Sequence, residues 1–109
     1  MMLKERTRRK MMYSIGYSPS LEKYILSSIV CWLVWYNRFF EISKEEYNLY
    51  RTDIKQLDRI AYECREQGTT SNRFLCSEKE EENTPAQLEL HSVLSEGFIP
   101  FDYHKCKFI

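Results

Sequence analysis

Glycine and proline are both scarce, with three residues of each in a chain of 109. Antiparallel sandwiches and barrels need a turn every ~8–12 residues, and glycine and proline mark most of those turns. Their scarcity argues against a many-stranded fold. A chain of this length forms one domain, and its 43% hydrophobic content supplies enough material for a core.

The chain also lacks an excess of charge, since 16 basic residues balance 16 acidic ones. Binding to nucleic acid rests largely on neutralised phosphates, so a nucleic-acid partner is not expected. Basic residues gather between Lys4 and Lys10, and acidic ones between Glu78 and Glu82. We expect residues 1–17 to form a basic flexible arm and residues 18–109 to form a single helical domain.

Signatures of metal binding and catalysis are missing. The four cysteines have no CxxC spacing, and only two histidines are present, so neither a zinc site nor another metal site is predicted. No phosphate-binding loop, HExxH or GxSxG motif occurs. His91 and His104 stand apart and suggest no shared site. We therefore predict no catalytic residue, no cofactor and no enzymatic activity.

The cysteines carry two smaller predictions. Cys31 lies in an apolar run and Cys64 on an apolar helix face, so both are expected to be buried and to behave as small hydrophobes. Reduced thiols and the absence of a secretory signal predict a cytoplasmic protein. Cys106, fourth from the end, sits where a prenyl group would attach, but Lys107 and Phe108 fit that motif poorly.

No uncharged run is long enough for a clear membrane span. The stretch from Tyr24 to Tyr36 is uncharged over thirteen residues, whereas a spanning helix needs ~20. Ser18 and Pro19 resemble a helix start, so a buried core helix over about 19–40 is predicted. The alternative is a single-pass membrane protein, an accessory subunit of a larger complex, with a spanning helix near 24–40 and a membrane contact through Tyr24–Phe40.

The strongest positive signal is a capped amphipathic helix from Lys44 to Gln67. Ser43 and Glu46 have the spacing of a capping box, and Gly68 supplies a stop. Apolar residues recur at alternating steps of three and four: Tyr47, Tyr50, Ile54, Leu57, Ala61 and Cys64.

A homodimeric coiled coil through this helix is disfavoured. A parallel dimer would oppose Asp53 and Asp58, and an antiparallel one would oppose Arg51 and Arg65. The apolar face is instead expected to pack on the helix before it, giving an antiparallel helical hairpin of residues 19–40 and 44–67.

The rest of the chain completes the predicted fold. Thr84, Pro85 and Gln87 open a short third helix over about 85–96, and the aromatic tail after Phe98 is expected to be extended. The predicted fold class is therefore all-α, a small helical bundle.

With no site for chemistry, the prediction is a small non-enzymatic protein-interaction module, acting as an inhibitor, immunity-type blocker or adaptor. Exposed aromatic residues and arginines are the usual anchors of interfaces. On this basis the predicted partner-binding residues are Tyr50, Arg51, Arg59, Tyr62, Phe101 and Tyr103.

Overall fold

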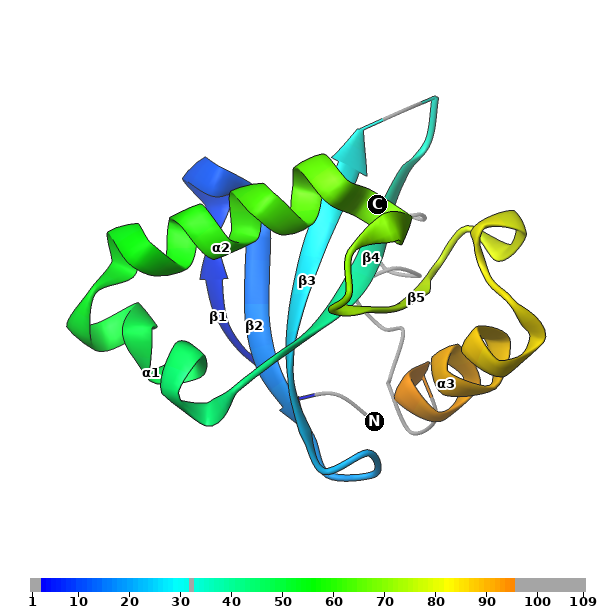
Figure 1. The fold of residues 1–109 in the computed structure, drawn as a ribbon, viewed down its shortest axis with the longest axis horizontal. Coiled ribbons are helices and arrows are strands. Elements are labelled where there is room, and N and C mark those ends of the chain that lie inside the picture. Colours follow the sequence, from blue (N-terminus) through cyan, green and yellow to red (C-terminus); the bar gives the residue numbers. More distant parts are fainter. Residues whose placement is uncertain (1–2, 32, 96–109) are drawn as a thin grey trace, which may run out of the picture.

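A computed structural model describes residues 3–31 and 33–95 and contains a five-stranded antiparallel sheet (Figure 1). The strands lie side by side in sequence order. They are β1 (Leu3–Arg8), β2 (Tyr13–Ser18), β3 (Lys23–Cys31), β4 (Trp35–Ile42) and β5 (Phe74–Ser77). The helices are α1 (Lys44–Thr52), α2 (Ile54–Gln67) and α3 (Pro85–Ser95). Short 3-10 turns follow β1, α2 and β5: η1 (Arg9–Met11), η2 (Gly68–Thr70) and η3 (Glu80–Glu82).

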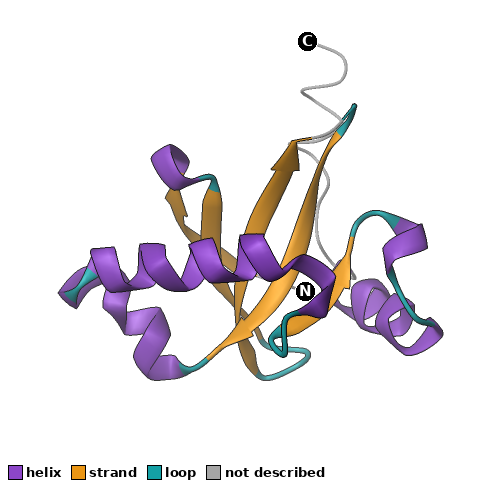
Figure 2. Ribbon diagram, turned by 45° about the horizontal axis from the view of Figure 1, so that its top comes forward, coloured by secondary structure: helices purple, strands orange, loops and turns teal. Residues whose placement is uncertain are grey.

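The main core lies between one face of the sheet and α2, which crosses in front of the strands (Figure 2). Side chains on successive strand residues point to opposite faces, so Leu26 joins this core while Ile25 joins a second one. The buried members of the main core are Tyr13, Ile15, Leu26, Phe40, Ile42, Leu57, Ile60, Ala61 and Cys64.

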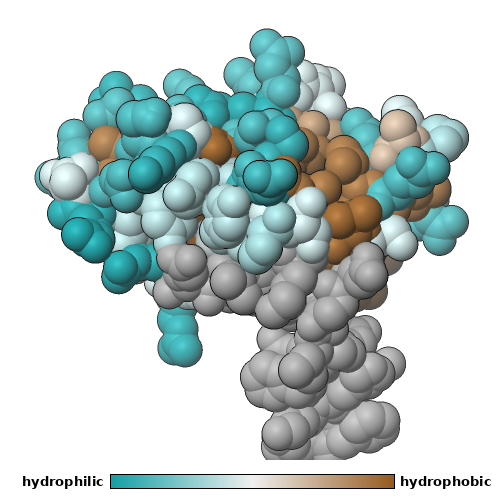
Figure 3. All heavy atoms as spheres, turned by 90° about the horizontal axis from the view of Figure 1, so that it is seen from below, coloured by the Kyte–Doolittle hydropathy of each residue, from teal (hydrophilic) through white to brown (hydrophobic). Residues whose placement is uncertain are grey.

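The second core is smaller and lies around β5 and α3. Its buried members are Ile25, Leu75, Cys76 and Leu94. Figure 3 shows hydrophobic side chains at the surface on the right, the side of β5 and α3, while the side of α1 and α2 is mostly hydrophilic.

The prediction of an all-α bundle is wrong, and the segment 19–40 explains the error. Instead of a helix it forms a turn followed by β3 and β4, which pair from Tyr24 with Ile42 to Cys31 with Trp35. Both faces of the sheet are partly covered, so the strands read as one continuous apolar run rather than as an alternating pattern. The two predicted helices therefore do not form a hairpin, and α2 packs on the sheet instead.

The predicted flexible arm and membrane helix are also corrected. Residues 3–17 contribute β1 and most of β2, whose Tyr13 and Ile15 are buried. The segment near 24–40 is a strand pair, and within the described ranges no helix has the length and apolar character to cross a bilayer.

The predicted helix over 44–67 is present as two helices that meet at Asp53. The capping box is confirmed: the Ser43 hydroxyl accepts from the Glu46 amide at 3.0 Å, and Glu46 accepts from the Ser43 amide at 2.8 Å. Asp53 ends α1 and then caps α2, with its carboxylate accepting from the Gln56 amide. Gly68 follows α2 with a positive φ of 55°, as expected of a helix stop.

The third helix is confirmed by α3 and by its predicted cap. Thr84 and Gln87 exchange hydrogen bonds of 2.8 and 3.2 Å in a second capping box. The predicted tail, the prenylation pattern at Cys106 and residue His104 lie outside the described residues.

Candidate protein-docking surface

One end of the sheet forms a step from which a single hairpin projects. Ile29 pairs with Asn37 in the register of β3 and β4 and donates its amide to the Met12 carbonyl at 3.1 Å. The Glu78 amide donates to the Asn37 carbonyl at 3.0 Å. These four residues form one row across the sheet, at which the β1–β2 turn closes and β5 ends.

Among the described strands, the β3–β4 hairpin alone continues beyond this row, through the pairs Val30–Tyr36 and Cys31–Trp35. At ~3.3 Å per residue, two to three residues carry its end roughly 7–10 Å past the row. Figure 1 shows this hairpin, in cyan, reaching beyond both the blue β1–β2 turn and the yellow segment after β5.

The end of this hairpin is apolar and exposed. Leu33 is 92% exposed, Val34 72% and Trp35 67%, and we call these three residues the hairpin tip. Single exposed apolar residues are ordinary, but a contiguous group marks an interaction site. Together they form the most exposed group of large hydrophobic side chains in the described part of the chain.

A hollow of about 410 Å³ lies beside the tip, between Leu33, Val34 and Tyr36 on one side and Glu78 and Lys79 on the other. It occupies the step where β5 ends and the hairpin continues.

The outer edge of β4 is also open here. Alternate residues of an antiparallel strand direct their backbone groups to the same neighbour, and Asn37 bonds Glu78 on the β5 side.

Trp35 precedes Asn37 by two residues and therefore directs its backbone N–H and C=O to the β5 side as well, beyond the last residue of β5. Among the described residues none pairs with this short edge.

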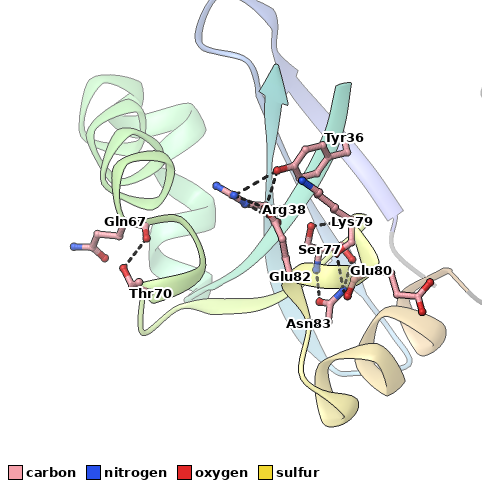
Figure 4. A network of polar contacts seen from close by, with 9 residues as sticks. All are labelled: Tyr36, Arg38, Gln67, Thr70, Ser77, Lys79, Glu80, Glu82 and Asn83. Atoms are coloured by element: carbon pink, nitrogen blue, oxygen red, sulfur yellow. Dashed lines mark hydrogen bonds and ion pairs between the residues drawn. The ribbon is translucent and has the colours of Figure 1, made fainter. Parts of the chain in front are cut away.

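Residues 78–82, which we call the acidic segment, follow β5 and are fixed against the base of the hairpin by an ionic network (Figure 4). Arg38 donates to both carboxylate oxygens of Glu82, at 2.9 and 2.6 Å, and Tyr36 donates its hydroxyl at 2.7 Å. The Arg38 hydrogen bonds, with those from Tyr36 and Ser77, outweigh the effect of burial and lower the pKa of Glu82 to about 2. Lys79 lies 5.9 Å from the centre of the Tyr36 ring.

A second set of contacts fixes the backbone of the same segment. The Asn83 side chain accepts from the Ser77 amide at 2.8 Å and donates to the Ser77 carbonyl at 2.9 Å (Figure 4). It also donates to the Lys79 carbonyl at 3.2 Å. These hydrogen bonds fix the position of the acidic residues relative to the hairpin.

Two further carboxylates could have carried chemistry, but each is held in a structural ion pair. Arg73 donates to both oxygens of Glu46 and lowers its pKa, although burial opposes the shift. A hollow of about 280 Å³ lies beside this pair, and Glu41 is the one other acidic residue among the described residues that line it. The pair of Arg73 and Glu46, like that of Lys23 and Glu41, connects neighbouring elements.

Asp58 is the second of these carboxylates and joins α2 to the β1–β2 end of the sheet. It accepts from Arg8 at 3.2 and 3.1 Å and from the Tyr13 hydroxyl at 2.8 Å. Burial would raise its pKa, but these two donors together lower it. Tyr13 is buried beside Asp58, and both effects raise the pKa of its hydroxyl.

The described cysteines differ in their exposure. Cys64 is buried as predicted, and burial raises its pKa to about 11; Cys76 is likewise buried, with a pKa of about 12. The prediction for Cys31 is wrong, because it is exposed near the tip. The His91 ring lies 6.3 Å from the Phe39 ring between centres, and the two rings are tilted by 41°. No cluster of potential metal ligands occurs within residues 3–31 and 33–95.

Four of the predicted partner-binding residues lie in the described part of the chain, and three of them are exposed. Arg59 and Tyr62 are exposed one turn apart on α2, with Tyr62 57% exposed. Arg51 is exposed near the end of α1. Tyr50 instead packs against the main core and donates its hydroxyl to the Thr7 carbonyl at 3.4 Å. Phe101 and Tyr103 lie outside the described residues.

Sequence reasoning missed the hairpin tip because its residues resemble core residues. One signal could have revealed it: thirteen uncharged residues exceed the usual strand of ~5–6 residues. If the run is divided into two strands, the turn between them falls near Leu33 and Val34.

No protein-family model, curated protein or solved structure matches this chain. Its function is therefore inferred from the chemistry of its own surface.

Proposed function

We propose that this protein is a small non-enzymatic interaction module that binds a protein partner through the hairpin tip. The observation that carries the proposal is the exposure of Leu33, Val34 and Trp35. Trp35 pairs with Cys31 on the neighbouring strand, and Leu33 and Val34 lie in the bend before it. A side chain held on a paired strand, as Trp35 is, loses less conformational entropy on binding, and tryptophan is among the residues enriched at interface hot spots.

The magnitude of apolar burial explains why the surroundings of the tip matter. Fully burying one large apolar side chain is worth ~1.5–3 kcal/mol, so three supply roughly 5–9 kcal/mol. Association itself costs ~4–15 kcal/mol. The tip alone therefore supports only weak binding. Contacts to the hollow beside Tyr36 and Lys79, or to the charged groups that flank it, have to supply the remainder.

Arg59 and Tyr62 on α2 remain a second predicted contact surface, and the two surfaces can be compared directly. The test is affinity capture from cells of the source organism followed by mass spectrometry. One bait carries Leu33→Ser, Val34→Ser and Trp35→Ser, and the matched bait carries Arg59→Ala and Tyr62→Ala. Both change exposed side chains only, and circular dichroism confirms that each variant folds.

We expect a partner captured by the natural protein to be lost with the tip variant and retained with the α2 variant. Loss with the α2 variant alone would transfer the function to the outer side of α2. Retention by both variants would refute the proposal.

A further inference from the structure

The step, the tip and the flanking charges are arranged so that this end of one copy is complementary to the same end of a second copy. Across the end of the sheet the basic β1–β2 turn comes first, the apolar hairpin second and the acidic segment after β5 last. Arg9 and Lys10 are exposed on the first, and Glu80 and Glu81 on the last. With strands ~4.8 Å apart, β2 and β5 place the two charged groups roughly 14 Å from each other.

We propose that the partner of the hairpin tip is a second copy of this chain, bound end to end about a two-fold axis perpendicular to the sheet. The inference rests on the proposed function and specifies its partner. A rotation of 180° about this axis reverses the order of the strands. The basic turn of each copy then faces the acidic segment of the other, and both hairpins meet at the centre.

The position of the hollow determines how the two hairpins contact each other. Because the step lies on the β5 side of each hairpin, the two hairpins lie alongside each other and each fills the step of the other copy. The open edges at Trp35 then meet and run antiparallel, as in the addition of a strand to a sheet edge. Leu33 and Val34 of one copy enter the hollow beside Tyr36 of the other.

The same charges argue against a bilayer as the surface that covers the tip. Trp35 beside Leu33 suits a membrane interface, and Arg9 and Lys10 would attract anionic lipid. The exposed carboxylates of Glu78, Glu80 and Glu81 lie at the same end and cancel that attraction. A surface that carries both signs in a fixed order is matched by a partner with the reversed order, and the chain itself provides one.

The test uses two charge-reversal variants of the full-length protein. One carries Arg9→Glu and Lys10→Glu, and the other carries Glu80→Lys and Glu81→Lys. Sedimentation velocity over a concentration series should show the natural 13.2-kDa chain in a monomer–dimer equilibrium that weakens as salt is added. Each variant alone should dimerise roughly tenfold or more weakly, because like charges then face each other.

The decisive sample is an equimolar mixture of the two variants, since each charged group then faces the opposite sign again. We expect the mixture to recover dimerisation, which a merely unfolded variant cannot do. The matched control reverses exposed charges on α2, Arg59→Glu and Glu63→Lys, and should leave the equilibrium unchanged.

A cross-link locates the contact. In a Cys31→Ser background, Val34→Cys should form a disulfide-linked dimer under mild oxidation, whereas Leu88→Cys on α3 should not. A strictly monomeric natural protein that still loses another captured protein when the tip is changed would overturn this inference and leave the proposed function standing. Tip-dependent co-sedimentation of the monomer with phosphatidylserine vesicles would overturn both, as would a monomer with no tip-dependent binding.

Discussion

Replacing Glu82 by glutamine should remove a defined part of the acid sensitivity of the fold. Glu82 lies in the bidentate pair with Arg38, with 15% of its side chain exposed. Its pKa falls from 4.5 to about 2 on folding. A shift of one pKa unit corresponds to 1.36 kcal/mol. The ionised carboxylate therefore contributes on the order of 3 kcal/mol to the free energy of unfolding at neutral pH.

The sign follows from the direction of the shift. Because the pKa is lower in the folded state, this stabilisation is fully present above pH 4.5 and is lost as the pH falls from there toward 2. Glutamine has nearly the same shape but carries no charge and cannot titrate. The variant should therefore be less stable than the natural protein at pH 7, and the difference should shrink below pH 4.5.

The assay is urea unfolding followed by circular dichroism at pH 7, 5, 4 and 3, for the natural protein, Glu82→Gln and the control Glu81→Gln. Glu81 is exposed, so its substitution should change stability by less than ~0.5 kcal/mol at every pH. A gap between the natural protein and Glu82→Gln that stays constant from pH 7 to pH 3 would refute the reasoning.

Three other predictions follow from single contacts. Gly68→Ala should destabilise the fold by ~1–2 kcal/mol in urea unfolding, since an added Cβ at φ 55° would lie 2.9 Å from Nη1 of Arg38; Thr69→Ala next to it should be neutral. Ser43→Ala should cost ~1 kcal/mol by removing the cap of α1, and a loss equal to that of an exposed-site control such as Lys44→Ala would contradict this. Iodoacetamide at pH 8 should modify Cys31 well before Cys64 and Cys76, whose burial raises both pKa values; peptide mass mapping gives the order, and equal rates would disprove it.

Local signals were readable in the sequence because they depend on residues three positions apart. Both capping boxes and the stop at Gly68 fall where the pattern places them. The break at Asp53 was missed, since an aspartate inside a periodic helix is also tolerated as a surface residue. Here its carboxylate competes for a backbone amide and starts a new helix.

The sheet was missed because both faces of its strands are covered, which removes the alternation of apolar and polar residues that marks a strand. Ile25 and Leu26 are both buried, each under a different layer, and neighbouring buried residues do not separate a strand from a helix. The candidate site was missed for the same reason. Leu33, Val34 and Trp35 have the composition of a core, and only the hairpin register places them in solvent.

The order of the strands has a consequence for how this chain folds and opens. The first four strands are neighbours in both sequence and space. The β1–β4 meander can therefore pair through short loops, whose closure costs little conformational entropy. β5 joins only after residues 43–73 have folded back, and it adds just four residues at the edge. We therefore expect β5 and the segment it carries to be the last part to assemble and the first to exchange its amide hydrogens.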